Sequence, residues 1–229
     1  MINPVTLDLH ATVTPTTHDA PAVAHAAALF GLDADQSQPL TLVPPLQLTL
    51  RPAQLVFITG PSGTGKSTLL RELTTQLKHH DPDTRHIDLD HLPPWPDRPL
   101  AEGLPQPLPD DLNTLTHALS RAGLAEAALL LRTPAQLSVG QRFRLRLAHA
   151  IALSQHTPPD TRTLLTADEF AAPLDRTTAA NLAKTLHRWS RTTHATLVIA
   201  TAHDDLLEPL QPDTLVHLTP HHQAEVLTR

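Results

Sequence analysis

The chain has 229 residues, 40% of them hydrophobic, which is enough for one packed domain. Its net charge of −6 argues against a stand-alone nucleic-acid binder, because neutralising phosphates requires clustered lysines and arginines. The absence of cysteine excludes disulfides and thiolate metal sites and is consistent with the cytoplasm. No stretch approaches the roughly 20 apolar residues that span a bilayer, and residues 1–15 lack the pattern of a signal peptide, so we expect no direct membrane insertion.

The first quarter of the chain is typical of β-structure around one short helix. Residues 5–14 alternate polar and apolar side chains and predict a strand. The alanine-rich segment 21–30 predicts a helix that ends at a glycine. Two more alternating stretches, 40–43 and 46–50, are separated by a pair of prolines and predict two further strands. We assign residues 1–54 to an N-terminal β-rich portion.

A strand, a helix and a second strand follow. Residues 55–59 form a continuous apolar run, which suits a buried parallel strand. Leucines at helical spacing predict a helix over 67–78, and residues 87–90 predict a short strand. Residues 93–110 hold seven prolines among eighteen residues and predict a loop with little regular structure.

Two short helices are predicted after this loop. Apolar residues at helical spacing indicate one helix over 112–122, which ends at Gly123, and residues 124–132 indicate a second. Together with the proline-rich loop, these helices form a reduced helical subdomain, residues 93–136.

Helices and strands alternate in the rest of the chain. The predicted elements are helices 139–153 and 179–189 and strands 163–167, 196–201 and 215–218. Strands that alternate with helices imply an α/β fold with a mostly parallel sheet flanked by helices. We therefore expect residues 1–229 to form one domain, with an antiparallel β portion at its N-terminus.

A phosphate-binding loop follows the strand at 55–59. The segment Gly60-Pro61-Ser62-Gly63-Thr64-Gly65-Lys66-Ser67, followed by Thr68, matches the pattern G-x-x-x-x-G-K-S between a buried strand and a helix. Glycines let successive N–H groups point at phosphate oxygens, and the helix adds its positive end. We expect Lys66 to reach the β- and γ-phosphates and the Ser67 hydroxyl to bind Mg²⁺. The sequence thus predicts a site for a triphosphate with Mg²⁺.

Two adjacent acids follow the apolar strand at 163–167. The strand delivers Asp168 to the magnesium site, where we expect it to hold Mg²⁺ mainly through water. Glu169 is the candidate general base that polarises the attacking water.

One segment distinguishes this P-loop protein from kinases and GTPases. Leu137-Ser138-Val139-Gly140-Gln141-Arg142 resembles LSGGQ, the signature of ATP-binding cassette (ABC) ATPases, with valine in place of the third-position glycine. At the start of a helix, Ser138, Gly140 and Gln141 form an anion site, which by this resemblance binds the γ-phosphate held by a second copy of the chain.

Two further segments come in the order that the family shows. Residues 172–175 resemble the D-loop, which contacts the other copy. His203, just after a predicted strand, resembles the switch histidine, which bonds the γ-phosphate and the attacking water. The resemblance covers about residues 40–218. It implies a P-loop fold, hydrolysis of ATP with Mg²⁺, and an ATP-dependent head-to-tail homodimer.

Three features depart from the cassettes of ABC transporters. Residues 31–56 contain no Tyr, Phe or Trp, although an aromatic residue before the P-loop usually stacks on adenine in those proteins. The interval from Lys66 to Ser138 is short, which reduces the helical subdomain that grips membrane partners. The Q-loop glutamine, a further magnesium ligand, would be Gln106; because it lies in the proline-rich loop, it is equally well an ordinary loop residue.

The segments 28–32, 137–146, 168–176 and 202–207 together look most like soluble ABC ATPases that are fused to a GNAT-type acetyltransferase domain, and that domain is absent here. The leading interpretation is a soluble ATPase dimer that drives a conformational change in a partner, with a separate acetyltransferase-like chain as one candidate. The alternatives are the ATPase subunit of an ABC transporter and a slow ATP-gated dimerisation or sensor module.

Overall fold

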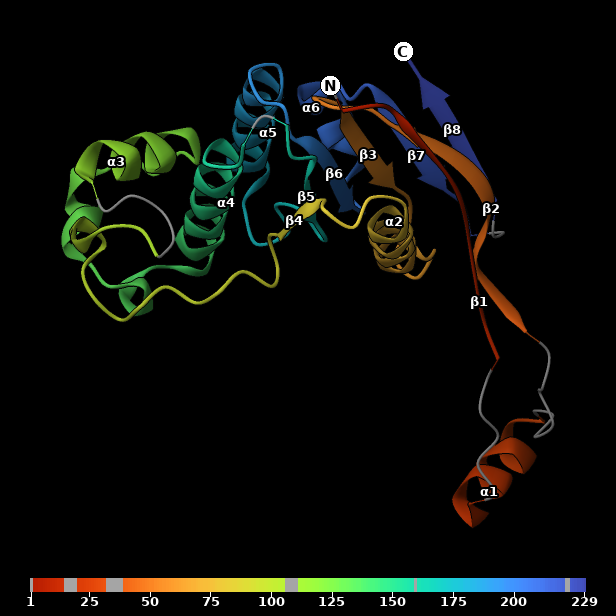
Figure 1. Cartoon of the computed structure of the whole chain (residues 1–229). Helices are drawn as coiled ribbons and strands as arrows, with labels where there is room; N and C mark the ends of the chain where they lie inside the picture. The colour runs from red at the N-terminus through yellow and green to blue at the C-terminus, as the bar shows by residue number, and fades with distance from the viewer. Residues whose placement is uncertain (1, 15–19, 32–38, 106–110, 159, 221–222) are drawn as a thin grey trace.

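The computed structural model describes residues 2–14, 20–31, 39–105, 111–158, 160–220 and 223–229 (Figure 1). Its described strands form a six-stranded sheet in the order β4-β5-β6-β3-β7-β8 and a two-stranded sheet of β1 and β2. In the larger sheet all neighbours pair in parallel except β7 and β8, which are antiparallel. This arrangement confirms the predicted α/β fold with an antiparallel N-terminal portion.

The described strands are β1 (Val5–Val13), β2 (Leu40–Leu50), β3 (Leu55–Thr59), β4 (Arg85–Asp88), β5 (Thr163–Ala167), β6 (Thr196–Thr201), β7 (Thr214–Leu218) and β8 (Ala224–Thr228). The described α-helices are α1 (Pro21–Phe30), α2 (Lys66–His80), α3 (Leu112–Arg121), α4 (Val139–Gln155), α5 (Arg176–Ser190) and α6 (Leu207–Leu210). Short 3-10 turns occupy Leu100–Glu102, Ala127–Leu131, Pro134–Gln136 and Asp204–Leu206.

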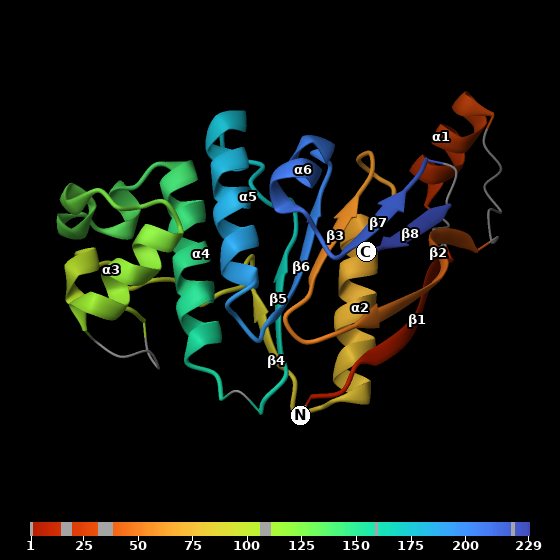
Figure 2. The ribbon, with the colours of Figure 1, turned by 90° about the horizontal axis from the view of Figure 1, so that it is seen from above.

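The six-stranded sheet separates two apolar cores, because successive side chains of a strand point to opposite faces. Leu55 and Phe57 of β3 belong to the core that packs against α3, α4 and α5. Val56 and Ile58 belong to the core that packs against α2, β1 and β2. All four side chains are fully buried. The continuous apolar run in the sequence therefore reflects a strand that is covered on both faces (Figure 2).

The prediction of two strands within residues 40–50 is wrong. These residues form the single strand β2, and the two prolines lie at an irregularity of its pairing with β1. Leu9 pairs with Leu46 and Ala11 pairs with Val43, so two residues of β2 lie opposite one residue of β1. A bulge of this kind leaves residues without ladder partners, which is why proline can occur there.

The predicted helix over residues 124–132 is also wrong. The chain leaves α3 through Gly123, which has a left-handed φ of +73°, and the N–H of Leu124 donates to the carbonyl of Leu119 at 2.8 Å. Beyond this point only the short 3-10 turn at 127–131 forms, and no side chain caps its start. By contrast, α3 begins at Asp111, whose carboxylate accepts the N–H of Thr114 at 2.8 Å.

Besides short 3-10 turns, one described strand and one described α-helix were not predicted. The strand β8 pairs with β7 at the end of the sheet, and its side chains are half-buried or exposed, so it carries no strong apolar pattern. The helix α6 has only four residues, which is too short for a periodic signal.

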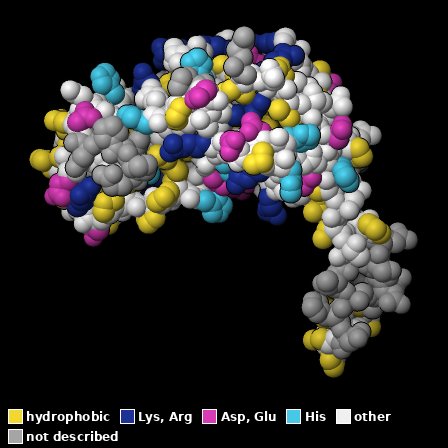
Figure 3. Space-filling model, viewed as in Figure 1, with side chains coloured by type: hydrophobic (Ala, Val, Ile, Leu, Met, Phe, Trp, Pro, Cys, Tyr) yellow, Lys and Arg dark blue, Asp and Glu magenta, His cyan; other side chains and the backbone are white. Residues whose placement is uncertain are grey.

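The N-terminal arm consists of the hairpin of β1 and β2 together with α1, which lies beyond the end of the hairpin and away from the larger sheet (Figure 1). In α1 the side chains of Leu29 and Phe30 are 68% and 77% exposed. Hydrophobic side chains gather at this end of the molecule in Figure 3. None of the helices in the described part of the chain is long and apolar enough to cross a membrane.

Candidate functional site

The candidate site lies at one edge of the larger sheet, where parallel strands end next to each other. In that sheet β6 lies between β5 and β3, and Thr59 at the end of β3 pairs with Thr201 at the end of β6. The N–H of Phe170, in the turn after β5, donates to the carbonyl of Ala200 in β6 at 2.9 Å. The P-loop, the acidic turn and the loop with His203 therefore leave the sheet side by side, as is usual for binding sites in open α/β sheets.

The P-loop packs tightly between two strands. Gly60 and Gly65 have φ values of +142° and +95°. A Cβ atom on Gly60 would lie closer than 3.0 Å to the carbonyl oxygen of Leu218 in β7, and one on Gly65 would lie equally close to that of Leu42 in β2. Both positions therefore require glycine for two reasons, the backbone angle and the space.

Lys66 lies under this loop as the first residue of α2. Its side chain is buried, and its ammonium group donates to the carbonyls of Gly60 at 2.8 Å and Pro61 at 2.7 Å. Burial lowers the pKa of Lys66, whereas the nearby carboxylates of Asp168 and Glu169 raise it. The positive charge is thus held between the P-loop and the two acids that follow β5.

The other predicted P-loop residues differ in their exposure to solvent. Ser62 and Gly63 are exposed, Thr68 is half-buried, and Ser67 faces solvent at the start of α2. Thr64 is buried, and its hydroxyl donates to the carbonyl of Pro61 at 2.9 Å, which braces the loop.

Asp168 and Glu169 occupy a strained turn after β5. Glu169 has a φ of +44° and Ala171 has a φ of +60°, a region that residues other than glycine rarely adopt. The carboxylate of Asp168 accepts the N–H of Glu169 at 3.0 Å, and the N–H of Asp168 donates to the carboxylate of Asp90 at 2.9 Å. Such strain persists only where surrounding contacts enforce it, and it concentrates at functional sites.

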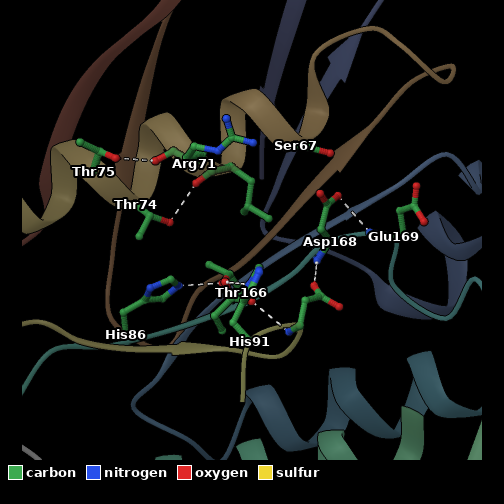
Figure 4. Close-up of a pocket in the computed structure, with 12 residues that line it drawn as sticks. Ser67, Arg71, Thr74, Thr75, His86, His91, Thr166, Asp168 and Glu169 are labelled. Atoms are coloured by element: carbon green, nitrogen blue, oxygen red, sulfur yellow. Dashed lines mark hydrogen bonds and ion pairs between the residues drawn. The ribbon is translucent and has the colours of Figure 1, made fainter. Parts of the chain in front are cut away.

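Ser67, Asp168 and Glu169 line one cavity of about 460 Å³ (Figure 4). The cavity continues between α2 and β4, where Thr74 and His86 also line it. His86 forms a hydrogen bond of 2.7 Å with the hydroxyl of Thr166, and burial lowers its pKa.

The oxygen atoms of this cavity fit a magnesium ion. Ser67 supplies a hydroxyl and Asp168 a carboxylate, and Mg²⁺ favours one or two such ligands together with waters and phosphate oxygens. Within the described ranges, no group of three or more His, Cys, Asp or Glu side chains could hold a metal ion by itself. The residues therefore fit an ion that shares its ligands with a bound triphosphate.

His203 leaves the sheet from β6, next to the P-loop and the acidic turn. It is half-buried, and its N–H donates to the Thr201 hydroxyl at 3.3 Å. It is not among the residues that line the cavity. Arg176, at the start of α5, pairs with Asp205 through its Nε atom at 2.9 Å. This ion pair connects the segment after Glu169 to the loop with His203.

The signature segment lies elsewhere in the same chain. Ser138 is the N-cap of α4: its hydroxyl accepts the N–H of Gln141 at 3.2 Å, and the Gln141 side chain accepts the N–H of Ser138 at 3.0 Å. A Cβ atom on Gly140 would lie 3.0 Å from Leu174 of the D-loop segment. Ser138, Gly140 and Gln141 are not among the residues that line the cavity.

The candidate Q-loop residue, Gln106, lies outside the described residues. The side chains that enter the cavity from the end of β4 are instead Asp88, Asp90 and His91. Sequence reasoning missed them because their relation to Asp168 depends on the pairing of β4 with β5, which no local pattern reveals.

Comparisons with known proteins agree with this geometry. A family model described as an AAA ATPase domain matches residues 45–213. A lipoprotein-releasing system ATP-binding protein of Rhodopirellula baltica is 30% identical, with 72% of this chain and 80% of that protein covered. A putative 2-aminoethylphosphonate import ATP-binding protein of Salmonella choleraesuis is also 30% identical, with 70% of this chain covered. This chain spans 47% of that relative, about half of its length.

Solved structures show the same fold. A dimeric ATP-binding cassette in a post-hydrolysis state, bound to ADP and Pi, superposes with a TM-score of 0.64 at 18% identity. The match covers 98% of this chain and 100% of that one. A dimeric bacterial ABC transporter cassette superposes with a TM-score of 0.59 at 19% identity, with 84% of this chain and 93% of that one covered.

Proposed function

This chain belongs to the ATP-binding cassette (ABC) ATPases, and on that premise we propose that it hydrolyses MgATP at sites shared between two head-to-tail copies of itself. The observation that carries the proposal is the position of Ser67, Asp168 and Glu169 around one cavity beside the P-loop. The signature residue Ser138 lies on a separate exposed helix start.

In this proposal each half of the site has a distinct task. The P-loop N–H groups, the positive end of α2 and Lys66 bind the phosphates. Ser67 and Asp168 would hold a magnesium ion, which would supply positive charge to the phosphate oxygens. Glu169 takes a proton from the attacking water, and His203 orients that water and the γ-phosphate from the neighbouring strand.

The dimer follows from the surface around α4. Val139 beside Ser138 is 60% exposed, so an apolar side chain is available at the surface next to the signature. Gly140 packs on Leu174, so the signature and the D-loop segment form one continuous surface. A twofold axis would place this surface of each copy on the P-loop of the other, and the γ-phosphate would lie against the start of α4.

The relatives favour a transporter as the partner of this dimer over a soluble one. Two of them carry import or lipoprotein release in their names. We therefore place the transporter subunit ahead of our first interpretation, a soluble partner, and the comparisons give no support to an acetyltransferase partner. Between β4 and α4 the described elements are the ten-residue α3 and three short 3-10 turns, so a coupling surface there would be small.

The proposed activity can be tested with wild type and Glu169→Gln. Phosphate release measures turnover, and light scattering measures ATP-dependent dimerisation. We expect Glu169→Gln to lose turnover by about 10²-fold or more, because it lacks the general base, and to retain the dimer. Equal turnover of the two proteins would remove Glu169 as the base. Dimerisation without turnover in wild type would favour the slow ATP-gated module.

A further inference from the structure

We propose that Asp90 is a positioning residue of the hydrolytic site, and that its carboxylate holds the turn that aims Glu169. The inference rests on the proposed ATP hydrolysis. Asp90 follows β4 and lies outside the P-loop, the acidic turn and the signature.

The first observation is a direct contact with the acidic turn. Asp90 is half-buried and lines the same cavity as Asp168 and Glu169. Its Oδ2 atom accepts the backbone N–H of Asp168 at 2.9 Å. In turn, the N–H of Asp90 donates to Asp88 at 2.9 Å. The Asp90 side chain therefore links the turn after β5 to the end of β4. Figure 4 shows the cavity that it lines.

The second observation is the strain in the turn that this bond supports. Glu169, the next residue after Asp168, has a left-handed φ of +44°. A residue other than glycine adopts this conformation at a cost in free energy, and it persists only where surrounding contacts enforce it. The bond from Asp90 holds the Ala167–Asp168 peptide, one peptide before the one that enters Glu169, so it acts on the turn from which the Glu169 side chain leaves the backbone.

The third observation is a connection from Asp90 to the signature helix. Burial and the negative charges of Asp88 and Asp168 raise the pKa of Asp90, whereas the positive charge of Arg146 on α4 lowers it. One turn further along α4, His149 stacks edge-on against Trp95, at a ring distance of 5.9 Å. The segment from Asp90 to Trp95 therefore lies between the acidic turn and α4, whose first residues form the signature.

The test compares Asp90→Ala, Asp90→Asn and Asp90→Glu with Asp97→Ala. Asp97 lies in the same loop, is exposed and has no side-chain hydrogen bond within the described residues, so it controls for the loss of one negative charge. We expect Asp90→Ala to lower kcat by about 10- to 100-fold, because small displacements of a catalytic group cost this much. Asp90→Asn keeps an oxygen that accepts the same bond and should recover most of kcat. Asp90→Glu keeps the charge but moves the oxygen, and should resemble Asp90→Ala.

Two readouts separate positioning from a merely structural role. For positioning, KM for ATP stays within about twofold and the ATP-dependent dimer still forms in light scattering, because binding of the phosphates does not involve Asp90. A parallel fall of kcat and of dimer formation, or failure of Asp90→Asn to recover kcat, would overturn the inference. If Asp90→Ala does not fold, Asp90→Glu and Asp90→Asn decide the question by the same two criteria.

A double-mutant cycle gives the sharpest outcome. If Asp90 acts through Glu169, the change Asp90→Ala has no further effect on turnover in a Glu169→Gln background. Additive losses would show that Asp90 acts independently of Glu169 and would overturn the inference. An inactive wild type would instead refute the proposed hydrolysis, so the two failures are distinguishable.

Discussion

Gly65 provides the most direct test of how the P-loop is packed. The substitution Gly65→Ala places a Cβ atom closer than 3.0 Å to the carbonyl oxygen of Leu42, and a backbone carbonyl cannot rotate away as a side chain would. The residue has a φ of +95°, which costs an alanine about 1–3 kcal/mol. Overpacking against β2 adds about 1–3 kcal/mol. We therefore expect the free energy of unfolding to fall by about 2–6 kcal/mol, the sum of the two costs.

Gly63 supplies a matched control for this prediction. It lies in the same loop with a φ of +82°, but a Cβ atom there would meet no atom within 4 Å. Gly63→Ala should therefore show only the backbone cost, about 1–3 kcal/mol. The assay is urea unfolding without nucleotide, compared at equal m-values. Equal losses for the two substitutions would refute the close packing of the P-loop against β2.

Two further predictions concern buried polar side chains. Burial lowers the pKa of His149 to about 4, below its ordinary value of 6.5. At pH 5 His149 binds a proton in the unfolded chain but not in the folded chain, so the free energy of unfolding should fall by about 2 kcal/mol between pH 7.5 and pH 5. His149→Leu should abolish this contribution to the pH dependence, as measured by urea unfolding at the two pH values. An unchanged pH dependence would contradict the burial of His149 away from water. Arg162, which is almost fully buried, pairs with Asp81 at 2.8 Å. Arg162→Met should lower the free energy of unfolding by about 2 kcal/mol, as measured by calorimetry. An unchanged free energy of unfolding would show that this ion pair does not stabilise the fold.

Much of the site was predictable because its signals are local. The backbone angles of the P-loop already require glycines at Gly60 and Gly65, and the apolar run before it marks a strand covered on both faces. The pattern of Ser138 and Gln141 at a helix start is also visible in the sequence, because a capping box involves residues three apart.

The remaining features depend on contacts that no local pattern records. The two prolines led to a prediction of two strands where the structure has the single strand β2. The strand accommodates them because they lie at a bulge in its pairing with β1. The segment after Gly123 carries apolar residues at helical spacing, but it lacks a cap and forms only a 3-10 turn. Asp90 joins the site only because β4 pairs with β5. Gln106 lies outside the described residues, and its assignment to the site remains a prediction.

The central claim is that each ATP site combines the P-loop of one copy with the signature of the other. A mixing experiment tests it with Lys66→Ala, which disables the P-loop, and Ser138→Asp, which adds a negative charge at the signature but keeps an N-cap side chain. Each variant alone has no intact site. A mixed dimer has one intact site, so an equal mixture should recover about a quarter of the wild-type phosphate release. A mixture that stays inactive although light scattering and cross-linking detect mixed dimers would contradict the shared site.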